Sequence, residues 1–309
     1  MKITNIKQII EAHACRGTGS LGVYFKDLQT GETAEYHAEE PLQSASVFKV
    51  FVLAELFRQI KDGKHTLQDR YPLKTEDKSE GSGVLLLLDD GMELTIKDYA
   101  TLMMIISDNT AADFLFKLVG RDNILEHVIR PLGLTATKCD LTCSDLVAMC
   151  FEMDPGETIL ERFARGGLNF RNTPPLTCGM EMNDECSVKD VSKVLELLYH
   201  GEWMGRELDD EALAILKSCQ TNARIPKYLP KGTVVAHKTG SMDRVANDAG
   251  IVYTQQGDYI LSMFYNGNTA SAEEYESNDH AYFSEELLAH LSEAIYREYT
   301  EGEIKTAAK

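Results

Sequence analysis

The sequence has 309 residues, a length that predicts one large domain or two modest ones with a sizeable buried core. Hydrophobic residues make up 43% and charged residues 26%, ordinary values that exclude wholesale disorder and collagen-like repeats. With 31 basic residues against 49 acidic ones, the net charge of −18 disfavours nucleic-acid phosphates, so we expect no nucleic-acid partner. No apolar run is long enough to cross a bilayer, so no membrane span is expected either.

Hydrophobic periodicity predicts strands near both ends of the chain and helices between them. A hairpin with its turn at Thr30-Gly31 follows the first helix, and residues 132–183 show mixed charge and no clear period. In chain order, the predicted helices are 5–14, 46–60, 96–106, 110–119, 188–199, 209–216 and 283–299, and the predicted strands are 19–25, 33–37, 233–237, 249–254 and 259–265.

This order of elements predicts an α+β fold and not alternating βαβ units. We expect an antiparallel sheet assembled from residues 1–44 and 220–309 and flanked by the first and last helices. Residues 45–219 are expected to form an inserted all-α domain. An active site would then lie in the cleft between the two parts.

The seven cysteines do not predict a disulfide scaffold, because their number is odd and the chain is long. No CxxC pair or histidine cluster completes a metal pattern, so we expect neither a metal nor another cofactor. The N-terminus lacks the apolar core of a secretory signal. We therefore expect a cytoplasmic protein, or a periplasmic or extracellular one if a leader has been removed, and the oligomeric state stays open.

Ser46-Val47-Phe48-Lys49 is the only S-x-x-K motif in the sequence. On a helix, residues three positions apart share a face, so we expect Lys49 Nζ to reach Ser46 Oγ. A neutral lysine is a base that activates a serine hydroxyl for nucleophilic attack. Taken alone, the motif is more typical of a serine that caps a helix.

Two further motifs carry complementary polar groups. Ser107-Asp108-Asn109 lies between two predicted helices, where its serine would relay a proton and its asparagine would hold a carbonyl group or the lysine. Lys238-Thr239-Gly240 ends a predicted strand, where lysine and threonine would bind an anion and glycine would let a ligand approach the backbone. Taken alone, each is an ordinary helix cap or turn.

In this order and in these contexts, the three motifs together are the signature of class A β-lactamases and penicillin-binding proteins. The chain resembles this family of penicillin-recognising serine hydrolases over nearly its whole length. The family fold, an α/β sheet domain with an inserted all-α domain, agrees with the predicted elements. The resemblance implies an acyl-enzyme mechanism on β-lactam, ester or peptide substrates.

The resemblance also implies a role for each motif residue. Ser46 would be the acylated nucleophile, Lys49 its base, and Ser107 the relay of a proton to the leaving nitrogen. Asn109 would contact both the substrate and Lys49.

The substrate carboxylate would be bound at the other end of the cleft. The resemblance implies that Lys238 and Thr239 hold this carboxylate, and that the backbone N–H of Ser241 shares the oxyanion hole with that of the nucleophile. Arg224 stands where some class A enzymes carry an arginine aimed at the carboxylate, and Arg244 is the runner-up for that role. A guanidinium group suits a planar carboxylate.

The sequence departs from the family in the segment after Asn109. Class A enzymes need an Ω-loop glutamate, in a pattern close to Glu-x-x-Leu-Asn, to activate the water that frees the acyl-enzyme. An ungapped count places this glutamate near Cys143, and the pattern does not occur between Asn109 and Val188. Deacylation is therefore expected to be weak. The candidate substitutes, each more typical of a solvated surface charge, are Asp140, Asp145, Glu152, Glu157 and Glu161.

Three functions stay open on the sequence alone. The first is a serine hydrolase with measurable turnover of β-lactams or esters. The second is a penicillin-binding-type D-Ala-D-Ala peptidase or a slow-releasing acyl trap. The third, which the intact set of motifs disfavours, is a non-catalytic descendant that only binds ligands.

Overall fold

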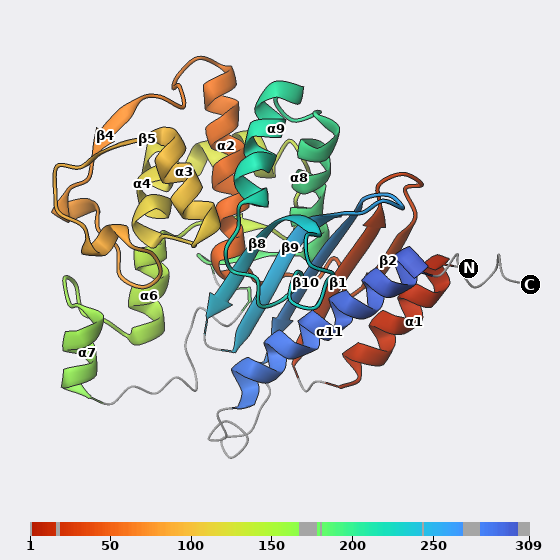
Figure 1. The fold of residues 1–309 in the computed structure, drawn as a ribbon. Helices are drawn as coiled ribbons and strands as arrows, with labels where there is room; N and C mark the ends of the chain where they lie inside the picture. The colour runs from red at the N-terminus through yellow and green to blue at the C-terminus, as the bar shows by residue number, and fades with distance from the viewer. Residues whose placement is uncertain are drawn as a thin grey trace, which may run out of the picture.

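The computed structural model describes residues 2–16, 19–166, 178–179, 181–242, 244–267 and 279–301. Its strands are β1 (Ser20–Asp27), β2 (Thr33–Tyr36), β3 (Leu42–Gln43), β4 (Arg70–Pro72), β5 (Glu93–Thr95), β6 (Lys138–Cys139), β7 (Asp184–Cys186), β8 (Val234–Met242), β9 (Val245–Tyr253) and β10 (Tyr259–Asn266). The main sheet is antiparallel with the order β2-β1-β10-β9-β8, so strands from both ends of the chain lie side by side (Figure 1). The predicted α+β class is confirmed.

The helices form two layers around this sheet. They are α1 (Lys2–Ala14), α2 (Lys49–Lys61), α3 (Ile96–Ile105), α4 (Asn109–Val119), α5 (Arg121–Ile124), α6 (Cys143–Phe151), α7 (Ile159–Arg165), α8 (Val188–His200), α9 (Arg206–Lys217) and α11 (Asp279–Glu301), with shorter turns η1 (Ala45–Phe48), η2 (Thr75–Asp77), η3 (Leu85–Leu87) and η4 (Leu125–Ile129). Helices α1 and α11 lie together on one face, and α2, α8 and α9 lie on the other (Figure 1). None of the helices described here is long and apolar enough to span a membrane.

Strand β10 shows that the sheet is the middle layer of three. All of its residues are buried. Leu261 and Met263 pack in the core shared with α1 and α11, whereas Ile260 and Phe264 pack in the core of the helical part. This alternation is the two-residue period of a strand, and here both faces of the strand meet apolar side chains.

Helix α2 runs through the helical part and is buried on nearly every side. Val50, Phe51 and Val52 are consecutive and inaccessible, and the buried carboxylate of Glu55 is paired with Arg58 at 2.7 Å. A helix that is buried on nearly every side belongs to a core. The S-x-x-K motif ends at Lys49, the first residue of this central helix.

The segment 45–219 is not wholly helical. Short strands β4 and β5 pair with each other, and β7 pairs with both β3 and β6. Strands of two or three residues are too short to show a hydrophobic period, so the sequence pattern gave no sign of them.

Two helices occupy part of the segment 132–183 that was expected to be irregular; residues 167–177 and 180 of it lie outside the described part. Helix α6 begins with a capping box formed by Thr142 and Asp145, and α7 begins with one formed by Thr158 and Glu161. The sequence signal for the start of each helix is therefore a threonine followed three residues later by an aspartate or a glutamate.

The sheet holds the turn that precedes the S-x-x-K motif. Asn247 of β9 is inaccessible, and its Nδ2 donates to Gln43 O at 2.8 Å and to Ser44 O at 3.0 Å. At Gly240 of β8, an added Cβ would lie 2.5 Å from Ser44 O, so only glycine allows this approach. Ala45 in this turn has a φ of 44°, a strained value that the surrounding contacts maintain.

The Asn247→Ala substitution tests this link between sheet and turn. It removes two buried hydrogen bonds that tie the sheet to this turn, so the free energy of unfolding should fall by about 2–4 kcal/mol. Urea denaturation measures the change. Asn5→Ala, which removes an exposed hydrogen bond to Glu298, should change stability by less than about 0.5 kcal/mol. Equal effects of the two substitutions would contradict the role of Asn247.

Candidate active site

The S-x-x-K motif places one side chain at the surface and one inside the protein. Ser46 is half-buried in η1, and Lys49, the first residue of α2, is inaccessible. Lys49 Nζ donates to Ser107 O at 2.8 Å, Ser107 Oγ at 3.1 Å and Asn109 Oδ1 at 3.0 Å. The expected hydrogen bond from Lys49 Nζ to Ser46 Oγ is not found among the described residues.

Lys238 brings a second amine to the same hydroxyl group. Its Nζ donates to Ser107 Oγ at 3.0 Å and to Thr239 O at 2.6 Å. The K-T-G motif lies within β8 and not at its end as predicted, because β9 pairs with this strand as far as Met242. Ser107 Oγ thus joins the start of α2, the turn between α3 and α4, and the edge strand of the sheet.

Burial and the neighbouring Lys49 lower the pKa of Lys238 to about 7. Behind it lies His237, whose Nδ1 is 2.9 Å from Asp248 Oδ1. Burial works against a charge on this imidazole, but the Asp248 carboxylate raises the pKa of His237 to about 10. Because the pKa of Lys238 is about 7, roughly half of the Lys238 amines are neutral near pH 7.

The S-D-N turn is fixed by its aspartate. Asp108 caps α4, and its Oδ2 accepts hydrogen bonds from the backbone N–H groups of Val84 at 2.6 Å and Leu85 at 2.9 Å. Asn109 Nδ2 donates to Glu80 O at 2.8 Å. The loop before η3, which forms one wall of the site, is thereby tied to the S-D-N turn.

A cavity of about 220 Å³ opens beside the candidate nucleophile. Its walls come from η1, the loop before η3, the start of α4, α6 and the end of β8. The lining residues are Ala45, Ser46, Phe48, Gly81, Ser82, Asn109, Cys143, Leu146, Val147, Cys150, Phe151, Ser241 and Met242.

Arg224 lies behind β8 and is only 3% exposed. Its Nη1 donates to Gly240 O at 3.0 Å and to Asn247 O at 2.7 Å. Its Nη2 donates to Ser241 Oγ at 2.6 Å and to Glu285 Oε1 at 3.0 Å. The guanidinium group therefore supports the end of β8 from behind and touches the cavity rim only through Ser241.

The other residues predicted for the carboxylate end lie along the same strand. Thr239 Oγ1 is 2.8 Å from Thr221 Oγ1, and Ser241 is exposed at the cavity rim. Arg244, the runner-up arginine, lies in the turn between β8 and β9 with a φ of 58°.

Cys143 occupies the position at which the ungapped count places the family's glutamate. Its side chain is buried against Lys49. Burial raises the pKa of Cys143 to about 12, although Lys49 acts in the opposite direction. Asp113 Oδ1 accepts from Cys143 N at 2.6 Å and so fixes the start of α6. A neutral thiol cannot take a proton from water near pH 7.

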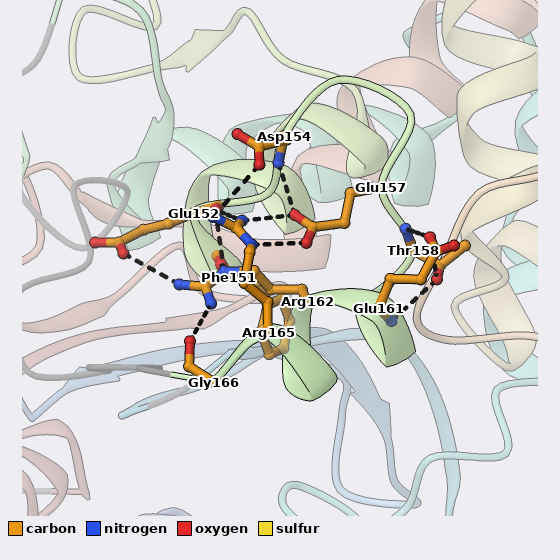
Figure 2. A network of polar contacts seen from close by, with 9 residues as sticks. All are labelled: Phe151, Glu152, Asp154, Glu157, Thr158, Glu161, Arg162, Arg165 and Gly166. Atoms are coloured by element: carbon orange, nitrogen blue, oxygen red, sulfur yellow. Dashed lines mark hydrogen bonds and ion pairs between the residues drawn. The ribbon is translucent and has the colours of Figure 1, made fainter.

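The five candidate substitutes for the glutamate are engaged elsewhere, and in the described part of the chain none of them lines the cavity. Figure 2 shows three of them held by arginines and by the cap of α7. Their partners are Arg121 for Asp140, Thr142 for Asp145, Arg162 for Glu152, Arg165 for Glu157 and Thr158 for Glu161.

Sequence reasoning missed two features of this site. The first is the wall that α6 contributes, for which the capping Thr142 and the apolar spacing after it were the available signals. The second is the pair formed by His237 and Asp248, which no local pattern reveals because the two residues meet only across paired strands.

Comparisons with known proteins agree with this geometry. A family model described as the beta-lactamase enzyme family matches residues 3–299. Beta-lactamase 3 of Bacillus cereus is 26% identical over 257 residues, which cover 82% of this chain and 71% of that one. A beta-lactamase structure from Sphaerobacter thermophilus has a TM-score of 0.75 at 25% identity and covers 96% of this chain and 97% of that one.

A structure of PBP-A is similar in fold, with a TM-score of 0.76 at 22% identity over 96% of this chain and 97% of that one. The family match spans nearly all of the chain, and side chains of the three motifs meet at Ser107 Oγ. The chain therefore belongs to the beta-lactamase enzyme family and is a class A β-lactamase-like serine hydrolase.

Proposed function

We propose that Ser46 is acylated by β-lactams, or by related amides and esters that bear a carboxylate, and that the acyl group is released slowly. The observation that carries this proposal is the hydroxyl of Ser107, which accepts hydrogen bonds from both Lys49 and Lys238 next to the cavity. Such a network moves protons between a nucleophile and a leaving group. Slow release follows from Cys143, the thiol that stands where the family has its base.

Acylation makes one bond and breaks one. Ser46 Oγ attacks the carbonyl carbon of the substrate, and the bond from that carbon to the leaving nitrogen or oxygen breaks. The proton of Ser46 passes to the pair of Lys49 and Ser107, and the leaving atom receives a proton from Ser107 Oγ. The 3.1 Å contact within this pair supports the transfer.

The oxyanion and the substrate carboxylate are bound at β8. The backbone N–H groups of Ser46 and Ser241, which both line the cavity, stabilise the oxyanion, and loss of one such donor costs roughly 3–4 kcal/mol in other acyl-transfer enzymes. Lys238 and Thr239 bind the carboxylate. Asn109 holds Lys49 in place at 3.0 Å and lines the same cavity, where it contacts the substrate.

The second candidate activity is that of a D-Ala-D-Ala peptidase or an acyl trap of the penicillin-binding type. Cys143 favours it, because a β-lactam acyl group can be shed only when a water molecule is activated beside it. The two candidates share the same acylation step and the slow release of a β-lactam acyl group, and they differ in the substrate that is turned over. Release of D-alanine from a D-Ala-D-Ala peptide therefore separates them.

The acyl-enzyme can be followed directly by intact-mass spectrometry with benzylpenicillin. We expect a persistent adduct of the whole penicillin on the native protein and none on Ser46→Ala. Cys143→Glu puts a carboxylate beside the ester and should shorten the lifetime at least about tenfold, since general bases contribute roughly 10²–10⁴-fold. Cys150→Glu, in the same cavity, is the matched control and should leave the lifetime within about twofold of the native value.

Other outcomes of this experiment are equally informative. Rapid turnover of benzylpenicillin by the native protein would contradict slow release and would show that the protein is an efficient hydrolase. If neither an adduct nor turnover is seen, with native protein and Ser46→Ala behaving alike, the protein is a non-catalytic ligand-binding descendant.

The lowered pKa of Lys238 predicts a pH dependence. The amine is a cation below pH 7 and becomes neutral above it, so each further pH unit leaves about a tenth of the cationic form. The second-order rate constant for acylation by a carboxylate-bearing substrate should fall as pH rises through about 7. An uncharged activated ester should not show this fall. The arginine of Lys238→Arg stays charged, so this substitution should remove the fall in the acylation rate constant with pH. If the pH profile of Lys238→Arg is the same as that of the native protein, the role of Lys238 is refuted.

Arg224→Ala tests whether this arginine binds substrate or supports the strand. The side chain donates to two backbone carbonyl groups at the end of β8, so its loss should slow acylation by carboxylate-bearing substrates and by uncharged esters to a similar extent. Paired rate measurements on the two kinds of substrate provide the check. A loss confined to carboxylate-bearing substrates would show direct binding instead, as the family resemblance implies.

A further inference from the structure

One face of α6 is an apolar stripe that forms a wall of the cavity. Its residues recur at the spacing of a single helical face, whereas Ser144 and Asp145 on the opposite side are exposed. The stripe consists of Cys143, Leu146, Val147, Cys150 and Phe151. This helix therefore turns its apolar side chains toward the space next to Ser46.

The remaining walls of the cavity are also free of charge. Phe48 and Met242 add apolar surface, and no cavity-lining residue in the described part of the chain carries a formal charge. The volume of about 220 Å³ exceeds the roughly 150 Å³ of an apolar cavity that is known to bind benzene in another protein. A group the size of a phenyl ring fits, and a charged group would lose its hydration without gaining a partner.

Cationic groups lie next to the cavity but do not line it. Lys238 and Lys49 converge on Ser107 Oγ, and Cys143 at the start of the stripe is buried against Lys49. A substrate acylating Ser46 therefore meets two different environments. Its carboxylate belongs with Lys238, and its acyl substituent belongs in the apolar cavity.

We infer that the substrates of this protein carry an uncharged, apolar acyl substituent of about the size of a phenyl ring, which packs against Leu146, Val147 and Phe151. This inference rests on the proposed function. It describes the acyl substituent, a part of the substrate that the contacts with the carboxylate do not define. The stripe discriminates by desolvation, because a charged substituent placed there is buried without a counter-ion.

A matched pair of probes tests the inference. Benzylpenicillin and ampicillin differ by one ammonium group on the acyl side, so the native protein should be acylated by benzylpenicillin at least about tenfold faster. Val147→Asp places a carboxylate in the cavity and should reduce this rate ratio at least about tenfold. Ser144→Asp adds the same charge to the exposed face of α6 and should leave the ratio within about twofold of the native value.

The outcomes separate this inference from the proposed function. If both penicillins acylate Ser46 at equal rates, or if Val147→Asp leaves the ratio unchanged while circular dichroism shows native folding, the apolar cavity does not select the substrate and the inference is overturned. If neither penicillin forms an adduct on Ser46, the proposed function fails and the inference fails with it.

Discussion

Two lysine amines share one hydroxyl group, and the protein has to bury both of them. Lys49 and Lys238 are inaccessible, and they reach Ser107 Oγ from positions 58 and 131 residues away in the chain. Burial, and after it the neighbouring Lys49, hold the pKa of Lys238 near 7. The site is therefore poised between charge states, as proton transfer in acylation requires.

This arrangement depends on contacts that align three separate segments. Asn247 and the close approach at Gly240 fix the turn before Ser46, and Asp108 fixes the loop that faces it. The sheet lies between two apolar cores, so its edge strand cannot shift without disturbing both. Helix α6 then completes the site with a thiol and apolar side chains. In this wall, the thiol and the apolar side chains that line the cavity include no carboxylate that could activate a water molecule.

Much of this could be predicted from the sequence, because both the motifs and the strands have short-range patterns. The order of the predicted helices and strands gave the class of the fold, and the three motifs contain the side chains that meet at Ser107 Oγ. The hydrogen bonds of Lys49 could not be predicted, since they depend on acceptors in the S-D-N turn. The contacts of Arg224 could not be predicted for a similar reason, because its partner Glu285 lies 61 residues further along the chain.

The segment around α6 was the least predictable part. Its apolar residues follow a helical spacing for only a few positions. The threonine caps that start α6 and α7 stand among glycine, proline and charged residues, which are typical of loops. The ungapped count to Cys143 nevertheless led to a residue of the site, since Cys143 lies against Lys49 and lines the cavity.

An NMR titration of the lysine amines tests the central claim most directly. In protein labelled with ¹³C at lysine Cε, the account predicts one lysine resonance that titrates near pH 7 and is absent from Lys238→Arg. If every lysine resonance of the native protein titrates above about pH 10, the ordinary range of an exposed amine, then the two buried amines do not share the site as described.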